Sequence, residues 1–304
     1  MRFDKKSLTS LIVIFAVLLA LVGVKVFNGD VDGDKPASLK IPDNDGQLVV
    51  HYLDVGQGDS AFIELPDGQC MLIDAAVSSY GDIIVETIEG YGYTEINYLV
   101  ATHPHADHIG GMTDVVEGFE IGEVYMPKAT STSKTFEGLL TAISDKGLQI
   151  NTAKADEIIY SDDETKIEIL APVSESYEET NNYSAVVKIT YGKNSFLFTG
   201  DAEELSENEM LDECCDKLRS DVLKVGHHGS SSSTSDAFLT AVGPQYAVIS
   251  CGADNSYGHP HKETINRLND MGIDYYRTDI NGAVTISCNG NDVFDIECEN
   301  ELDN

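Results

Sequence analysis

The chain has 304 residues, of which 42% are hydrophobic and 23% are charged, so its composition is that of a folded globular protein and not of a disordered one. Its length suits one large domain or two small ones, with a core that needs neither disulfides nor structural metals. The 52 acidic residues outnumber the 19 Lys and Arg and give a formal net charge of -33, which argues against broad, sequence-blind binding to polyphosphates.

Residues 1–27 predict a membrane anchor or a signal segment. Arg2, Lys5 and Lys6 precede an uncharged stretch, Ser7 to Val24, which as a helix nearly spans a bilayer. No Ala-x-Ala-like cleavage site follows, which favours an uncleaved anchor over a cleaved signal peptide. Because positive residues precede the stretch and acidic residues follow it, we expect a single-pass cell-membrane protein with an extracellular body, or a secreted protein if the segment is cleaved.

Residues 28–45 are rich in Gly, Asp, Pro and Lys and predict a linker, and residues 46–304 predict one folded domain. Apolar runs indicate strands at Leu48–Asp54, Ser60–Leu65, Cys70–Asp74, Tyr98–Thr102, Val186–Tyr191 and Ser195–Thr199. Helices are expected at Gly81–Tyr91, Phe136–Lys146, Ser206–Leu218, Ser235–Val242 and Lys262–Met271. Ser206 with Glu209 forms a predicted capping box. The mixed order predicts an α/β (α+β) fold with two sheets, or one split sheet, covered by helices.

Six cysteines in an exported chain raise the question of disulfides, and one pair can be tested from its local sequence. A three-residue loop, Asn289–Asn291, predicts a C-terminal hairpin in which Ile286 faces Phe294. In that register Cys288 and Cys298 do not face each other. We therefore expect mostly reduced, buried thiols.

Seven of the eight histidines follow predicted strands. They form three groups: His103, His105 and His108; His227 and His228; His259 and His261. Loops at strand ends let side chains from distant segments converge, and imidazole with carboxylate is the ligand set of zinc, manganese or iron. Solvated or structural histidines would be scattered, so the pattern predicts a metal site. For His259 and His261, a capped turn is the competing interpretation.

The run His-x-His-x-Asp-His, followed by Gly110-Gly111, resembles the metal-binding signature of the metallo-β-lactamase superfamily, and Gly200-Asp201 resembles its metal-bridging aspartate. Within the superfamily the chain is most similar to the hydrolase domain of ComEC-type competence proteins. The motifs that carry this resemblance are His51–Ser60, Thr199–Asp201, Lys224–Ser230 and Asn255–His261. The resemblance implies an αββα sandwich with a two-metal site at one edge.

The resemblance also implies the ligands. The first metal would be held by His103, His105 and Asp201, and the second by Asp107, His108, Asp201 and one of His227 or His228. Many family members supply a third histidine to the first metal, but none occurs here between His108 and Asp201, where Asn181–Ser184 takes its place. A site with fewer imidazoles favours manganese over zinc, so we expect two divalent ions that are either zinc or manganese.

A water activated by two metals would be the nucleophile. Candidate catalytic residues are Asp107, His228 and His259, of which His259, or whichever of His227 and His228 is not a ligand, would protonate the leaving oxygen. Candidate substrate-binding residues are Asn182, Ser184, Gly229, Ser230 and His259. The resemblance also implies that Asp54 and Asp59 lie near the metals, and a turn between two strands is the competing interpretation. Asp74 ends a predicted strand and is expected to contact the histidines from behind.

The sequence therefore predicts an exported, membrane-tethered phosphodiesterase or nuclease. Because the charge of -33 disfavours long duplex DNA, single-stranded DNA is the expected nucleic acid partner. An enzyme acting on other extracellular phosphodiesters, such as choline-phosphate groups of cell-wall polymers, is one alternative, and a non-catalytic metal-binding module is another. No protein partner can be inferred.

Overall fold

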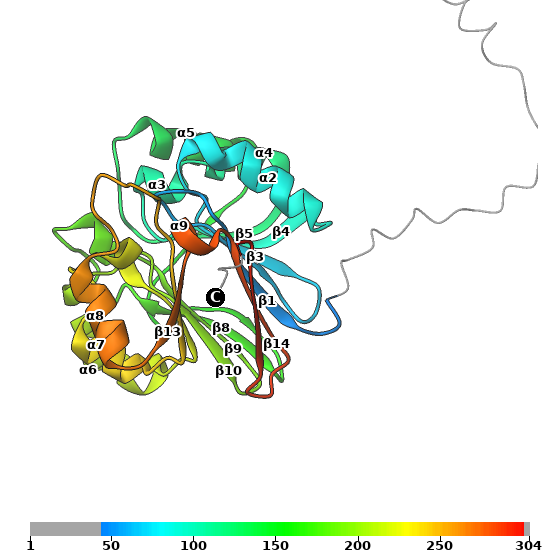
Figure 1. The fold of residues 1–304 in the computed structure, drawn as a ribbon. Coiled ribbons are helices and arrows are strands. Elements are labelled where there is room, and N and C mark those ends of the chain that lie inside the picture. The colour runs from blue at the N-terminus through cyan, green and yellow to red at the C-terminus, as the bar shows by residue number, and fades with distance from the viewer. Residues whose placement is uncertain (1–43, 301–304) are drawn as a thin grey trace, which may run out of the picture. The chain divides into compact units, whose positions relative to one another are not determined.

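Two β-sheets packed face to face, each covered by helices on its outer face, make up the fold (Figure 1). The structure is a computed structural model that describes residues 44–300, which lie in a single compact unit beginning at residue 41. The predicted αββα architecture is confirmed. The predicted anchor at residues 7–24 lies outside the described residues, and none of the helices between residues 44 and 300 combines the length and apolar character needed to cross a bilayer.

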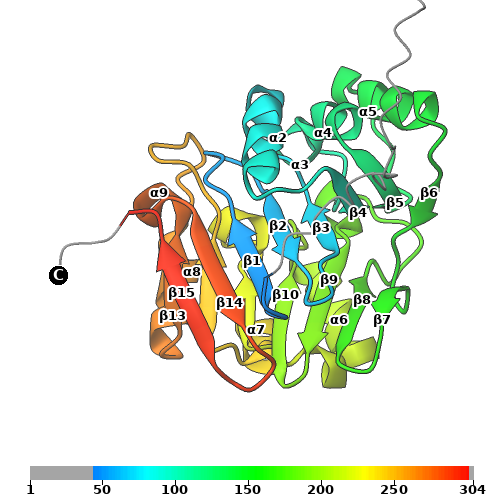
Figure 2. The same cartoon turned by 90° about the vertical axis from the view of Figure 1, so that its right-hand side faces the viewer.

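The first sheet runs in the order β15-β14-β1-β2-β3-β4-β5-β6. Its strands are β1 (Leu48–Tyr52), β2 (Ala61–Glu64), β3 (Cys70–Ile73), β4 (Glu95–Val100), β5 (Glu120–Met126), β6 (Ile150–Thr152), β14 (Val284–Cys288) and β15 (Phe294–Cys298). The last hairpin, β14–β15, therefore joins the sheet that the first strands begin, and Figure 2 shows it beside β1.

The second sheet runs in the order β13-β12-β11-β10-β9-β8-β7. Its strands are β7 (Ile158–Ser161), β8 (Thr165–Ala171), β9 (Val186–Tyr191), β10 (Asn194–Phe198), β11 (Val222–Lys224), β12 (Tyr246–Ile249) and β13 (Asp274–Arg277). Parallel pairing links β3 to β6 in the first sheet and β10 to β13 in the second. The carboxyl ends of parallel neighbours open at the same edge of their sheet, so their loops gather there.

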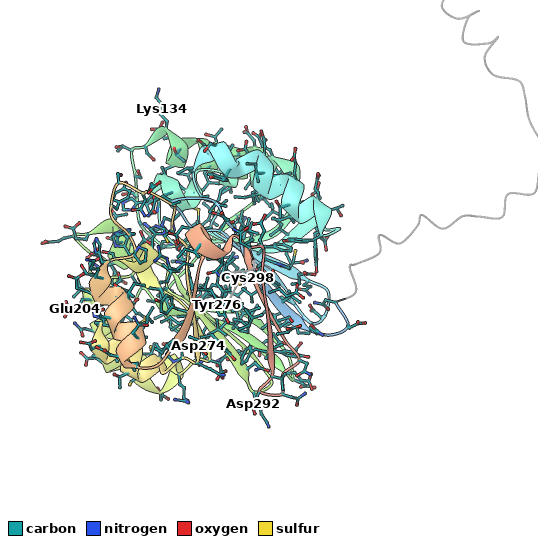
Figure 3. All side chains as sticks on the ribbon, in the orientation of Figure 1. Lys134, Glu204, Asp274, Tyr276, Asp292 and Cys298 are labelled. Atoms are coloured by element: carbon teal, nitrogen blue, oxygen red, sulfur yellow. The ribbon has the colours of Figure 1, made fainter. Side chains whose placement is uncertain are left out.

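Apolar side chains from both sheets form one core between them. Leu48, Val50 and Tyr52 alternate toward this core, as expected for a strand with a period of two, and all three are fully buried. At one side of the core, Tyr276 of β13 and Cys298 of β15, labelled in Figure 3, pack against it. None of the six cysteines, all of which lie in the described residues, forms a disulfide there.

Helices bury the outer faces of the sheets. The first sheet is covered by α2 (Gly81–Gly90), α3 (Ala106–Ile109), α4 (Met112–Gly118) and α5 (Lys134–Asp145), and the second by α6 (Glu204–Leu218), α7 (Asp236–Val242) and α8 (Lys262–Asp270). Short helical turns complete the described chain: η1 (Ser78–Tyr80), η2 (Thr180–Tyr183), η3 (Gly226–Gly229) and α9 (Thr278–Asn281).

The predicted register of the last hairpin is wrong. Ile286 pairs with Ile296, and Phe294 pairs with Cys288, because the loop is longer than the three residues expected. The register shift is two residues along one strand, which keeps every side chain on its predicted face. The apolar alternation therefore gave no signal that could separate the two registers.

The predicted capping box at Ser206 is also wrong. The helix α6 begins at Glu204, so Ser206 lies inside its first turn, and its buried hydroxyl has no hydrogen-bond partner. The cap comes instead from η2, where the amide oxygen of Asn182 accepts hydrogen bonds from the backbone N–H groups of Glu203 and Ser206. A cap supplied by a distant residue leaves no local sequence signature.

Candidate metal centre

Loops after four strands bring the predicted ligands together. The loop after β4 carries His103 and His105 and continues into α3 with Asp107 and His108; Asp201 follows β10; His227 and His228 lie in η3 after β11; and His259 follows β12. The backbones of His227 and His228 are both left-handed, with φ of 49° and 53°. Such conformations are uncommon outside glycine and tend to occur at functional sites.

Asp201 lies at the centre of the cluster, and its two carboxylate oxygens face different histidines. Oδ2 lies 3.7 Å from His103 Nε2 and 3.6 Å from His227 Nε2. Oδ1 lies 3.2 Å from His108 Nε2 and 3.6 Å from His228 Nε2. Asp201 is therefore positioned between two sets of imidazoles.

The remaining predicted ligands extend these two sets. His105 Nδ1 lies 2.9 Å from His103 Nε2, and Asp107 Oδ2 lies 3.5 Å from His228 Nε2. Ligand atoms of His103, His108 and Asp201 all lie within 4.8 Å of one another, as do those of Asp107, His108 and His228. The spacing brings together all seven residues that the sequence nominated as ligands.

The buried polar atoms of the cluster fit a cation. His108 Nε2, His228 Nε2 and Asp201 Oδ1 are buried without a hydrogen-bond partner. The opposite nitrogens are engaged, since His108 Nδ1 lies 2.7 Å from Asp74 Oδ2 and His228 Nδ1 lies 3.1 Å from the carbonyl oxygen of Ser250. A carbonyl oxygen only accepts, so His228 Nδ1 is the donor, and Nε2 faces the site, where a cation can replace its proton. The cluster can therefore bind metal.

The electrostatics of the metal-free cluster agree with this fit. Burial opposes the charge on Asp201, but the imidazoles around it, His108 foremost, hold the pKa of the carboxyl well below its usual range. Burial likewise opposes the charge on His228, yet Asp201 and Asp59 raise its pKa to about 9. The pKa of His108 is raised well above its usual value for the same reason, with Asp201 and Asp74 as its partners. Protons on these two imidazoles thus balance carboxylates that a cation would otherwise neutralise.

A second layer of buried groups holds the ligands in place. Asp59 Oδ1 lies 3.1 Å from His228 Nδ1, and Asp59 Oδ2 lies 2.8 Å from the ammonium of Lys224. Asp74 accepts hydrogen bonds from the backbone N–H and the hydroxyl of Thr102 and contacts His108, as expected from the sequence. Asp54 does not belong to this layer, because it is exposed and accepts a hydrogen bond from its neighbour Gly56.

A cavity of about 340 Å³ opens over the cluster. Its walls are Gln57, His105, Ala106, Asp107, Asn181, Asp201, His227, His228, Tyr257 and His259. Sequence reasoning nominated His259 for this position but missed Gln57, Asn181 and Tyr257. Gln57 and Tyr257 belong to motifs that carry the family resemblance, and Asn181 belongs to the run that takes the place of the third histidine, so these segments were the available signal.

Four predicted substrate-binding residues do not line the cavity. The side chain of Asn182 caps α6, and the Ser184 hydroxyl accepts a hydrogen bond from the backbone N–H of Asp201. Gly229 is buried beside Pro260, and the buried Ser230 hydroxyl contacts that of Ser232. Their positions are those of supports for the ligand loops.

Comparison with known proteins places the chain in a family. Residues 53–253 match the model of the metallo-beta-lactamase superfamily. ComE operon protein 3 of Bacillus subtilis is 29% identical over an alignment of 252 residues, which covers 77% of this chain and 32% of that protein. Competence protein ComA of Neisseria gonorrhoeae is 29% identical over 244 residues, covering 80% of this chain and 32% of that protein. The chain thus spans about a third of the length of these curated relatives.

A solved structure shows the same fold at low identity. CmlA, a diiron β-hydroxylase from Streptomyces venezuelae, has a TM-score of 0.53 and 16% identity, over 78% of this chain and 53% of that one. With the family match, the sandwich and a His/Asp cluster able to bind metal, the chain belongs to the metallo-β-lactamase superfamily, with the fold of its metal-dependent hydrolases and with ComEC-type competence proteins as its curated relatives.

Proposed function

We propose that this chain is a phosphodiesterase that uses two divalent cations, zinc or manganese, to cleave single nucleic acid strands and small phosphodiesters. The observation that carries the proposal is the position of Asp201, whose two oxygens face two separate sets of imidazoles. A carboxylate shared in this way suits a pair of cations. Bound there, they would acidify a water near neutral pH and offset charge on a phosphoryl oxygen.

The distances support one division of the ligands. The first set comprises His103, His105, His227 and Asp201 Oδ2, and the second comprises Asp107, His108, His228 and Asp201 Oδ1. In this assignment His228 is the ligand of the second set. His227 then supplies, from η3, the third imidazole that the sequence lacks between His108 and Asp201.

His259 and Asp107 act on the substrate side of the cluster. Burial, with His228 as its first charged neighbour, lowers the pKa of His259 to about 4, so the ring is neutral at pH 7. Gln57 Nε2 lies 3.5 Å from His259 Nδ1, which leaves His259 Nε2–H to donate to a phosphoryl or leaving oxygen. Burial opposes the charge on Asp107, but His228 and His108 lower its pKa to about 2, so it stays ionised and orients the attacking water as a hydrogen-bond acceptor.

Charge restricts the substrate. In the described part of the chain no Lys or Arg lines the cavity, and the net charge of -33 repels a long polyanion. Contact is then limited to the cations and a few neutral donors, which suits a strand end, a single strand or a small diester. Duplex binding should be weak, with a shallow dependence on salt concentration, because few counterions are displaced.

The test is a substrate panel on the full-length chain, stripped with chelator and reloaded with zinc or manganese. We expect metal-restored hydrolysis of bis-p-nitrophenyl phosphate and single-stranded DNA, and none of a β-lactam. Hydrolysis of a choline phosphodiester alone would favour the cell-wall alternative. Loss of all hydrolysis with full metal content would favour a metal-binding module.

The segment from Ser7 to Val24 is proposed to anchor the chain with its body outside the cell, because basic residues precede an uncharged span. Protease added to intact cells should then remove the body and spare the N-terminus. Mature protein found free in the medium, with its N-terminus beyond Val24, would show a cleaved signal segment instead.

A further inference from the structure

The mouth of the cavity carries an exposed aromatic ring. Tyr257 is 65% exposed, the highest fraction among the large hydrophobic residues of the described chain, and it is also one of the cavity-lining residues. An aromatic ring left in water costs free energy unless something covers it. Its position beside the metal cluster makes the substrate the group most directly placed to do so.

Tyr257 continues a row of rings that begins in the cluster. The ring of His228 lies nearly parallel to that of His259, with centroids 6.2 Å apart and planes at 29°. The ring of Tyr257 lies nearly parallel to His259 in turn, at 5.6 Å and 22°. The row leads from a proposed metal ligand to the surface and ends with a ring that is open to a partner.

The loop that carries Tyr257 is held in one conformation. The amide oxygen of Asn255 accepts hydrogen bonds from the backbone N–H groups of Tyr257 and His259, and its amide nitrogen donates to the carbonyl oxygens of Gly252 and His259. A ring presented on a fixed backbone loses little conformational entropy on binding. The exposed ring is therefore part of a prepared surface and not of a loose loop.

We propose that Tyr257 is a stacking platform for a nucleobase next to the scissile phosphodiester, which would make it a specificity-determining residue. The proposal rests on the phosphodiesterase function proposed above. A single flat ring suits a flat partner, whereas quaternary ammonium groups are typically held in cages of several aromatic rings, and Tyr257 is the only Phe, Tyr or Trp in the described cavity wall. Stacking also needs no Lys or Arg, in keeping with a described cavity wall that contains neither.

The test compares full-length Tyr257→Ala and Tyr257→Phe with a matched control, Tyr91→Ala. Tyr91 is 36% exposed and stacks on His51 at 4.3 Å and 18°, so its replacement removes a similar ring pair outside the cavity. The substrates are a single-stranded oligonucleotide and the same strand with abasic residues. A strand carrying 2-aminopurine reports stacking through fluorescence quenching on binding, whether or not it is cleaved.

Loss of the ring in Tyr257→Ala should raise KM for the normal strand by about 5- to 150-fold, with little change in kcat. This factor corresponds to the binding free energy that one base gains by stacking on an aromatic side chain. The wild-type enzyme should show a similar rise on the abasic strand, and Tyr257→Ala should add little to it. Tyr257→Phe and Tyr91→Ala should behave as wild type, and only Tyr257→Ala should leave 2-aminopurine unquenched.

Equal KM values of the wild-type enzyme for the two strands would overturn the inference and leave the phosphodiesterase intact. So would an equal loss of Tyr257→Ala on both strands, or a rise in KM confined to a choline phosphodiester. A wild-type enzyme that cleaves no phosphodiester with either metal and does not quench 2-aminopurine would overturn the proposed function as well.

Discussion

Replacing Lys224 by Met should destabilise the metal-free protein strongly, because it removes the cation of a buried ion pair. Lys224 Nζ lies 2.8 Å from Asp59 Oδ2, and the side chains are only 5% and 7% exposed. Burial opposes the charge on Asp59, and Lys224, followed by His228, holds its pKa below the usual range. Breaking a buried ion pair by removing one partner costs about 3–5 kcal/mol, and His228 beside Asp59 places the expected cost at the lower end of this range. For a domain of this size that corresponds to a fall in Tm of about 10 °C.

Urea unfolding of chelator-treated protein measures this cost, and Lys217→Met is the matched control. Lys217 Nζ lies at a similar distance, 2.7 Å, from Asp156 Oδ1, but these side chains are 36% and 80% exposed, so its loss should cost about 0–1 kcal/mol. Adding Asp59→Asn to Lys224→Met should restore part of the stability, since it removes the buried carboxylate that lost its ammonium partner. Equal losses of unfolding free energy in the two lysine variants would refute this reasoning. So would a double variant that loses more unfolding free energy than its two single variants together.

Three further predictions concern the cluster and its frame. Asp201→Asn should abolish hydrolysis and remove bound metal, whereas His261→Ala, outside the cavity wall, should keep both. Elemental analysis that finds the full metal content in Asp201→Asn would contradict the assigned ligands. Because the metal-free pKa of His228 is raised to about 9, metal binding at pH 7 should release protons, and the affinity for metal should rise as the pH rises toward 9. Calorimetry in buffers of different ionisation enthalpy counts the released protons, and a count of zero would be inconsistent with the raised pKa. Gly110→Ala should lower stability by about 3 kcal/mol, since a Cβ at this position collides with the backbone at the start of η1. Gly90→Ala, with open space around it, should raise stability by about 0.5 kcal/mol. Thermal melts that show equal changes in the two variants would argue against the close contact between Gly110 and η1.

Much of the fold could be predicted because strands and their loops leave local signals. The residues before His103, Asp201 and His227 are apolar runs, and the structure has strands there that end just before the ligands. The errors arose where local sequence is silent. A shift of two residues in the last hairpin preserves the faces of its strands, and the cap of α6 comes from Asn182, which is distant in sequence.

The site could be predicted to the level of which loops converge, but not of which side chains face the substrate. The sequence singled out the run from Asn181 to Ser184 as part of the site. Only the structure shows that Asn181 lines the cavity, whereas the side chain of Asn182 accepts a hydrogen bond from the backbone of Glu203. The sequence pattern likewise indicated the loop around His259, but it could not distinguish Tyr257, which lines the cavity, from His261, which does not. Side-chain direction in loops has no periodicity, so no pattern in the sequence could have decided it.

The place of the last hairpin governs the order in which this protein can fold. The strand β1 needs β14 as its neighbour, and Val284 and Ile286 of β14 fill the core between the sheets. A chain that emerges from its N-terminus keeps β1 as an open edge until nearly all of it has been released, and open edges invite pairing with other chains. The N-terminal half therefore keeps this edge open until β14 joins the sheet, and protection of β1 until then should limit aggregation.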